Sequence, residues 1–128
     1  MLSRTLQLST EAAHALPVPI FGAGQFGGTE GYCEAIASGL YAALSVSAQL
    51  NGEDAPLLPE ETAFGALIAY ATNPETQDYQ PMHVNFGIMK PLEKKIRNKR
   101  ERYAAYASRG DEKLRGYVEA LHKKDLIG

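Results

Sequence analysis

The sequence predicts a mostly α-helical domain with one or two short strands. Apolar residues recur at helical spacing in four segments, namely 29–51, 60–72, 93–108 and 112–124. Residues 5–8 (TLQL) and 18–23 (VPIFGA) are short apolar runs, and the second is typical of a strand. The 128 residues, 45% hydrophobic and 22% charged, suffice for one globular domain with a modest core.

Residues 1–52 are predicted to form a strand–turn–helix unit. Residues 18–23 read as a short buried strand, and the glycine-rich turn 24–28 follows it. The helix predicted over 29–51 has one apolar face with i,i+4 spacing, which is composed of Tyr32, Ile36, Leu40, Leu44 and Ala48. Gly52 provides a natural stop for this helix.

The remaining chain divides at residue 92 into a middle part (53–92) and a C-terminal part (93–128). In the middle part, a helix over 60–72 is bounded by prolines, and residues 73–92 lack any period, which predicts a structured loop. In the C-terminal part, Gly110 is expected to end the helix 93–108. Asp111 is expected to cap a second, amphipathic helix over 112–124.

Positive charge is concentrated in one short stretch, although the formal net charge is only −2. Residues 90–102 (KPLEKKIRNKRER) contain seven of the 13 basic residues, whereas residues 1–89 contain only Arg4. Such a block attracts phosphate groups, and its candidate residues are Lys94, Lys95, Arg97, Lys99 and Arg100. A solvated helix face with i,i+4 pairs such as Glu93–Arg97 is an equally good interpretation.

Several classes of protein and site are disfavoured. No apolar run approaches the roughly 20 residues that cross a bilayer, and the N-terminus is a poor signal peptide. The single cysteine, Cys33, cannot form an internal disulfide, which is typical of the reducing cytoplasm. The three histidines are isolated, so no metal site is predicted. We therefore expect a cytoplasmic protein that has no membrane partner.

The glycine-rich stretch 22–39 (GAGQFGGTEGYCEAIASG) predicts a binding turn at a helix start. Free N–H groups and the helix dipole favour an electron-rich ligand there, and glycines let the ligand approach the backbone. The letters also fit GxGxxG, but the acidic residue of that fingerprint would fall inside the following helix. A turn needed only for packing is the alternative.

Four ordered blocks resemble one family of tRNA-modifying flavoproteins. GQFGGTEGYCEAIASGL (24–40) resembles GQ(I/M)TGVEGYVESAASGL, and TLQL (5–8) matches its upstream block. ETAFGALIAYATNP (61–74) resembles ETALGALLAYITDP, and YQPMHVNFGIMKPLEKKIRNKRERY (79–103) resembles FQPMNVNFGLLPPLEKRIRDKKERY. The family is that of the folate- and FAD-dependent tRNA (uracil-5-)-methyltransferases (TrmFO/Gid type), which are related to the GidA-type flavoproteins.

The resemblance implies the C-terminal part of a Rossmann-like FAD-binding α/β domain without its N-terminal half. The implied cofactor is FAD, with methylenetetrahydrofolate and NADPH as co-substrates and tRNA as the partner. The family's N-terminal dinucleotide fingerprint and its catalytic cysteines have no counterpart, so we expect no catalytic residue in this chain. Cys33 stands where the family has valine, and a small buried side chain is expected there.

The resemblance also implies site residues. Gly24 and Gln25 would end the strand beside the ribityl and pyrophosphate groups of FAD. The start of the helix would face the isoalloxazine ring with Gly28, Glu30, Gly31 and Tyr32. The loop 79–87 would lie near folate and flavin, with candidates His83, Asn85 and Phe86, of which His83 replaces the family's asparagine.

Two other hypotheses concern the chain by itself. It could be a truncated, non-catalytic domain that binds RNA through residues 90–102 or self-associates as a homo-oligomer. Alternatively, a separate chain could supply the N-terminal half, so that the two assemble.

Overall fold

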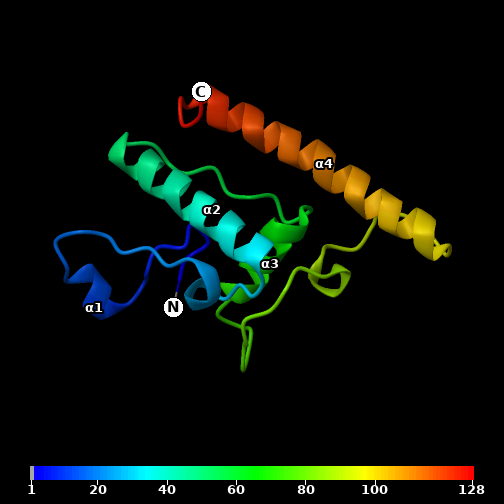
Figure 1. The fold of residues 1–128 in the computed structure, drawn as a ribbon, viewed down its shortest axis with the longest axis horizontal. Helices are drawn as coiled ribbons and strands as arrows, with labels where there is room; N and C mark the ends of the chain where they lie inside the picture. Colours follow the sequence, from blue (N-terminus) through cyan, green and yellow to red (C-terminus); the bar gives the residue numbers. More distant parts are fainter. Residues whose placement is uncertain (1) are drawn as a thin grey trace.

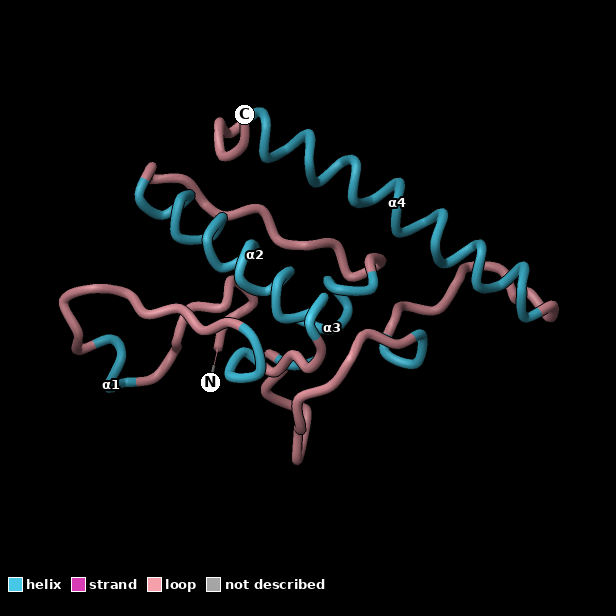
Figure 2. The backbone as a smooth tube through the Cα atoms, viewed as in Figure 1, coloured by secondary structure: helices cyan, strands magenta, loops and turns pink. Residues whose placement is uncertain are grey.

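The computed structural model describes residues 2–128, apart from the side chain of Ala12, and helices dominate it (Figures 1 and 2). The α-helices are α1 (Glu11–His14), α2 (Tyr32–Leu50), α3 (Ala63–Ala71) and α4 (Lys99–Lys123). Two short 3-10 turns, η1 (Gly24–Gly27) and η2 (Phe86–Ile88), precede α2 and α4. The predicted mostly α-helical fold is therefore confirmed for the described part of the chain.

The predicted buried strand over 18–23 is wrong. Among residues 2–128 only isolated bridges form, and Phe21 pairs with Gln7 in one of them. Leu8 N donates to Ile20 O at 2.7 Å and Gly22 N to Leu6 O at 2.9 Å, so the two segments lie antiparallel over a short distance. Leu6 itself has φ 63, which bends the first segment and prevents a longer ladder.

Helix α2 begins at Tyr32, later than the sequence pattern predicts. Gly28 (φ 88) and Gly31 (φ 108) hold the preceding residues outside the helical region. The helix ends at Leu50, and Gly52 (φ 70) follows it in a left-handed conformation. The predicted stop at this glycine is confirmed.

The predicted apolar face of α2 is only partly buried. Ala48 is buried and Leu44 half-buried, but Tyr32, Ile36 and Leu40 are exposed. The face turned inward carries mainly small and polar side chains instead, which are Glu34, Ser38, Tyr41, Ala42, Ser45 and Ala48. The described chain therefore packs against α2 from the side opposite to its large apolar residues.

Helix α3 is capped by a residue that bonds in both directions. Thr62 Oγ1 accepts from Gly65 N at 3.0 Å and donates to Pro59 O at 2.7 Å. A Cβ atom at Gly65 would lie 2.0 Å from Pro59 O, so only glycine allows this close approach. Helix α3 occupies the core of the predicted segment 60–72 and buries Leu67 and Ile68, as the pattern indicates.

The C-terminal part forms one continuous helix, so the predicted break at Gly110 is wrong. Asn98 caps α4, because its Oδ1 accepts from Glu101 N at 3.0 Å, and residues 93–98 are not helical. An interior glycine costs a helix only about 1 kcal/mol, which the surrounding helix-forming residues offset. Asp111, expected as a cap, pairs with Arg115 at 3.0 Å within the helix.

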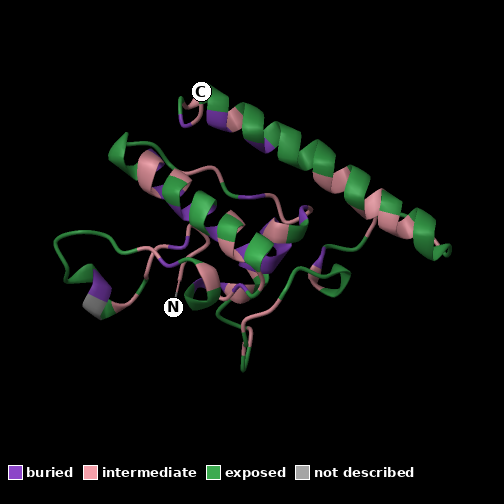
Figure 3. Ribbon diagram, viewed as in Figure 1, coloured by how far each residue is buried: buried purple, intermediate pink, exposed green. Residues whose placement is uncertain are grey.

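The core gathers side chains from segments that are far apart in the sequence. Leu6, Tyr41, Ile68 and Leu121 are its most deeply buried large residues, from the N-terminal segment, α2, α3 and α4. Figure 3 shows that α4 is exposed along much of its length, with its buried residues near its C-terminal end. Helix α4 is thus attached mainly by Tyr117 and Leu121.

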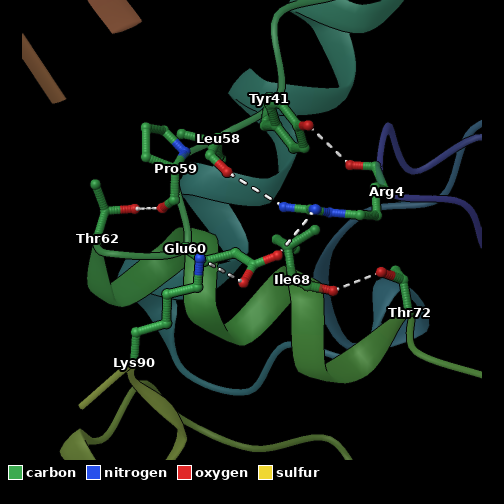
Figure 4. A network of polar contacts seen from close by, with 9 residues as sticks. All are labelled: Arg4, Tyr41, Leu58, Pro59, Glu60, Thr62, Ile68, Thr72 and Lys90. Carbon is green, nitrogen blue, oxygen red and sulfur yellow. Dashed lines mark hydrogen bonds and ion pairs between the residues drawn. The ribbon is translucent and has the colours of Figure 1, made fainter. Parts of the chain in front are cut away.

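A polar network fixes the N-terminal segment to the middle of the chain (Figure 4). Tyr41 on α2 donates its hydroxyl to Arg4 O at 2.8 Å. Arg4 Nη1 lies 3.0 Å from Glu60 Oε1, and Lys90 Nζ lies 3.6 Å from the other oxygen of that carboxylate. Lys90, the first residue of the basic run, therefore forms an ion pair within the chain.

Candidate functional site

The glycine-rich turn is fastened to the helix that follows it. Gly24 N donates to Ser38 Oγ at 2.7 Å, and Ser38 is fully buried on α2. Gly24 O accepts from both the backbone N (3.2 Å) and the hydroxyl (2.9 Å) of Thr29. Gly24 and Gln25 therefore lie in the turn η1 rather than at the end of a strand. These bonds give the turn one fixed position at the start of α2.

The loop 79–84 closes on this turn from a distant part of the chain. Tyr79 donates its hydroxyl to Gly28 O, and Glu30 N donates to Met82 O at 3.0 Å. Thr29 and Met82 also form a parallel bridge. The structure thus brings together two segments that the sequence singled out separately.

Glu34 joins the same two segments, although sequence reasoning did not select it. Its Oε1 accepts from Val84 N at 3.3 Å and lies 3.6 Å from His83 Nδ1. Gly31 has φ 108, which favours glycine, and a Cβ atom there would lie 2.4 Å from Glu34 Oε2. Glu34 lies in the first turn of α2 only because the helix begins at Tyr32, whereas the first turn of the predicted helix 29–51 contains Glu30 instead.

The surroundings of Glu34 favour its charged form. Its own backbone N–H, the N–H of Val84 and the His83 imidazole lower the pKa of the Glu34 carboxyl below its ordinary value of 4.5, although burial opposes them. The carboxylate therefore stays ionised at neutral pH. It links the helix start to the loop through a charge-assisted hydrogen bond.

One side of the turn remains open. The backbone N–H groups of Tyr32 and Cys33, in the first turn of α2, have no acceptor within residues 2–128. Gly24 (φ 64) has no atom within 4 Å of the position a Cβ would take. Gln25 and Glu30 are exposed, and the Tyr32 side chain is 92% exposed. The open side can therefore accept an electron-rich group against the backbone.

Cys33 does not have the predicted buried position, because it is exposed. The inward direction in this turn is taken by its neighbour Glu34, which is buried against the loop. Successive residues of a helix point about 100° apart, so the thiol is turned outward.

The three loop candidates separate into two groups. His83 lies beside Gly31 and Glu34, and its side chain is 64% exposed. Asn85 caps η2, since its Oδ1 accepts from Gly87 N at 2.9 Å. Phe86 stacks on Tyr103 of α4 with 4.2 Å between the ring centroids. Only His83 faces the glycine turn, while the other two shape the loop and attach it to α4.

The basic run also divides. Two of its seven cations bond within the chain: Lys90 pairs with Glu60, and Arg102 Nη1 donates to Ile96 O at 3.2 Å. Arg109, which follows the run on α4, donates from Nη2 to Lys90 O at 2.6 Å. The other five, Lys94, Lys95, Arg97, Lys99 and Arg100, are exposed and have no carboxylate partner within residues 2–128. The suggested Glu93–Arg97 helix pair does not form, because residues 93–98 are not helical.

Metal-ligand clusters and membrane-spanning helices are both absent from the described chain. Between residues 2 and 128, no three histidine, cysteine or carboxylate side chains cluster in a way that could hold a metal ion. Likewise, none of the helices in this range combines the length and the apolar character needed to cross a membrane.

Comparison with known proteins agrees with the resemblance of the four blocks. A family model described as glucose inhibited division protein A matches residues 4–54. Similar curated proteins are named methylenetetrahydrofolate--tRNA-(uracil-5-)-methyltransferase TrmFO. The protein of Bacillus cytotoxicus is 46% identical over 99 residues, which cover 77% of this chain and 23% of the relative. That of Bacillus pumilus is 44% identical over 102 residues, which cover 80% and 24% respectively.

The matched region is thus about a quarter of the length of these relatives. Over this region the similarity includes both segments that form the open-sided turn. The chain belongs to the TrmFO/GidA-type family.

Proposed function

We propose that this chain forms the C-terminal, FAD-contacting part of a methylenetetrahydrofolate-dependent tRNA (uracil-5-)-methyltransferase. The observation that carries the proposal is the joining of the glycine turn, the start of α2 and the loop 79–84 into one surface. Two of the four blocks that resemble the family meet in this surface. The proposal includes its place in a Rossmann-like FAD-binding domain acting in the cytoplasm.

The residues present fit one wall of a flavin site. The free N–H groups of Tyr32 and Cys33 can donate to an electron-rich ring or to a phosphate oxygen. The open approach at Gly24 lets a ligand reach the backbone, and Gln25 can donate from beside it. When bound, FAD would supply the reducing equivalents for the transferred carbon, with NADPH as their source.

His83 is the residue of this chain best placed to contact the folate. Its imidazole lies between the helix start and solvent, and an exposed ring nitrogen can hydrogen-bond a pterin edge. Glu34 restricts the position of the ring, since its carboxylate lies near Nδ1. We assign no catalytic residue to this chain, and His83 binds or positions in this proposal.

The five exposed cations around the start of α4 would contact tRNA. No carboxylate in the described part of the chain pairs with them, and the positive end of the α4 dipole adds to their field. Lysine and arginine contacts of this kind hold phosphates and carry no base specificity. Selection of the uridine would therefore depend on other parts of the enzyme.

The test compares two glycines that have similar positive φ angles. Gly24 (φ 64) and Gly52 (φ 70) both have open space at the Cβ position, but they lie before and after α2. The chain is mixed with the part of the Bacillus cytotoxicus relative that precedes its matched region, and FAD uptake is followed by absorbance and flavin fluorescence. Gly24→Ala should weaken FAD binding at least tenfold, because its methyl group occupies the approach to the backbone.

Gly52→Ala serves as the control, since it introduces the same strain away from the turn. It should leave FAD binding within twofold of the unmodified chain. Absence of any flavin uptake by the mixture, or equal effects of the two substitutions, would contradict the proposed site.

A further inference from the structure

The outer face of α2 carries a row of large apolar side chains that the described chain does not cover. Tyr32, Ile36 and Leu40 follow each other at i,i+4 spacing and are 92%, 73% and 64% exposed. We call these three residues the α2 stripe. Single exposed apolar residues are ordinary on protein surfaces, but an uninterrupted row of them marks an interaction surface.

Helix α2 also lacks the charges of a solvent-facing helix. Glu34 is its only charged residue, and this carboxylate points inward. Helix α4, by contrast, is strongly charged along its exposed surface. A helix whose outer face has no charged residue is typical of the interior of a larger protein. The composition of α2 therefore indicates that its outer face packs against further protein.

The stripe continues into an apolar groove between α2 and α4. The groove has a volume of about 670 Å³, and Leu40 belongs to both the stripe and the groove wall. On the opposite wall, Leu114 and Val118 of α4 are 43% and 37% exposed. Figure 1 shows α4 running alongside α2, so one elongated surface extends from the stripe to α4.

The other end of the stripe reaches the glycine turn. Tyr32 is the first residue of α2, and its free N–H forms part of the open side of the candidate flavin site. A partner that covers the stripe would therefore also stand opposite this open side. Burial of the stripe and completion of the site would be one event.

We propose that the α2 stripe and the adjoining groove are covered by the N-terminal remainder of a TrmFO-type protein, on the same or on a separate polypeptide. This inference rests on the proposed function. The relatives are about four times as long as the region that they share with this chain, so a large body of protein is available to cover the surface. Large apolar and uncharged side chains are expected on the covering face.

A second copy of the chain is a poorer occupant on charge grounds. Residues 1–89, which include α2, contain nine acidic residues and one basic residue. Pairing two copies through α2 would bring these acidic halves together, which like-charge repulsion opposes.

The experiment measures complex formation and flavin uptake on the same samples. The chain is co-expressed with the preceding part of the Bacillus cytotoxicus relative, and the complex is quantified by affinity capture and size-exclusion chromatography with light scattering. We expect a one-to-one complex that Ile36→Glu and Leu40→Glu each weaken at least tenfold. The control is Leu50→Glu, which is 82% exposed on the same helix but outside the stripe and groove, and it should change binding less than twofold.

The result separates the two proposals. A complex that depends on the stripe but takes up no FAD supports the interface and overturns the proposed function. FAD uptake that Ile36→Glu leaves unchanged overturns the interface. So does a homodimer of the chain alone that Ile36→Glu dissociates, because the surface would then belong to a second copy.

A fusion keeps the proposal testable where the preceding part does not fold by itself. In a single polypeptide that joins it to this chain, Ile36→Glu should lower the thermal unfolding midpoint, whereas the same substitution should leave the midpoint of the free chain unchanged. Equal effects in both proteins would overturn the proposed covering of the stripe.

Discussion

An ordinary amphipathic helix turns its large apolar side chains inward and its polar ones outward, but α2 largely reverses this distribution. The inner face buries Ser38 and Ser45 and lies against the glycine turn, while the outer face exposes Ile36 and Leu40. Small side chains on the inner face permit the close approach that lets Gly24 N reach Ser38 Oγ at 2.7 Å. The comparison shows that apolar periodicity identifies a face to be buried, but not the protein that buries it.

The buried hydroxyls of the inner face are satisfied, which removes most of the cost of their burial. Ser45 Oγ donates to Tyr41 O at 3.0 Å, and Ser38 Oγ donates to Ala35 O at 2.8 Å while it accepts from Gly24. The inner face is therefore held by specific hydrogen bonds, whereas the outer face offers mainly apolar area. Substitutions on the inner side should accordingly destabilise the chain by itself.

The largest effect is expected at Gly31. In Gly31→Ala the new methyl group would meet Glu34 Oε2 and His83 Nδ1, and φ 108 is strained for any residue with a side chain. We expect the free energy of unfolding to fall by about 2–4 kcal/mol. Urea denaturation of the free chain, followed by circular dichroism, measures this.

Gly39→Ala is the matched control on the same helix. It lies in open space and should raise stability by up to about 1 kcal/mol, because alanine favours helix over glycine. A Gly31→Ala protein as stable as the unmodified chain would show that the turn is not packed on Glu34 and His83.

A smaller effect is expected at Ser38. Ser38→Ala removes the acceptor of Gly24 N and leaves that donor unpaired, which costs about 1–3 kcal/mol. The same denaturation experiment measures this loss of stability. Ser47→Ala on the same helix is the control, because the half-buried Ser47 hydroxyl is not the acceptor of Gly24 N. Equal stabilities of the two variants would be inconsistent with the anchoring of η1 by Ser38.

The smallest effect on the inner side is a pH dependence at Glu34. Its pKa is lower in the folded chain than the ordinary value of 4.5, so its stabilising contribution is present above that pH. It is lost as the pH falls through the folded pKa. The thermal midpoint of the unmodified chain should therefore fall more between about pH 7 and about pH 3.5 than that of Glu34→Gln.

Glu93→Gln removes an exposed carboxylate and serves as the control for the loss of one charge. It should keep the pH dependence of the unmodified chain. If Glu34→Gln also kept it, the contacts of Glu34 with Val84 and His83 would not stabilise the folded state.

Periodicity and punctuation predicted much of the fold but not the length of its last helix. The segments 29–51 and 60–72 contain α2 and α3, because glycines bound the first locally and prolines with a threonine cap bound the second. Gly110 was misread as a break, since a single glycine lowers helix stability too little to end a helix. The strand predicted over 18–23 does not form, because within residues 2–128 its pairing with residues 6–8 amounts to a single bridge, Gln7 with Phe21.

The sequence predicted the separate segments of the candidate site, but not the contacts that join them. The glycine turn and the loop around His83 were each selected from the sequence, and the structure adds Glu34 and Tyr79, which hold them together. These two residues form contacts across some 50 positions of the chain, which no local pattern reveals. The exposure of Cys33 depends on the same contacts, because they turn Glu34 inward.

The sequence by itself determined where α2 and α3 form, where charge gathers and which turn requires glycine, because these depend on neighbouring residues and backbone conformation. The tertiary structure alone decided which face of α2 is buried and which cations remain free. Burial and pairing depend on residues distant in the chain, such as Gly24 against Ser38 or Lys90 against Glu60. The α2 stripe is not buried by the described chain, so its burial depends on a further partner.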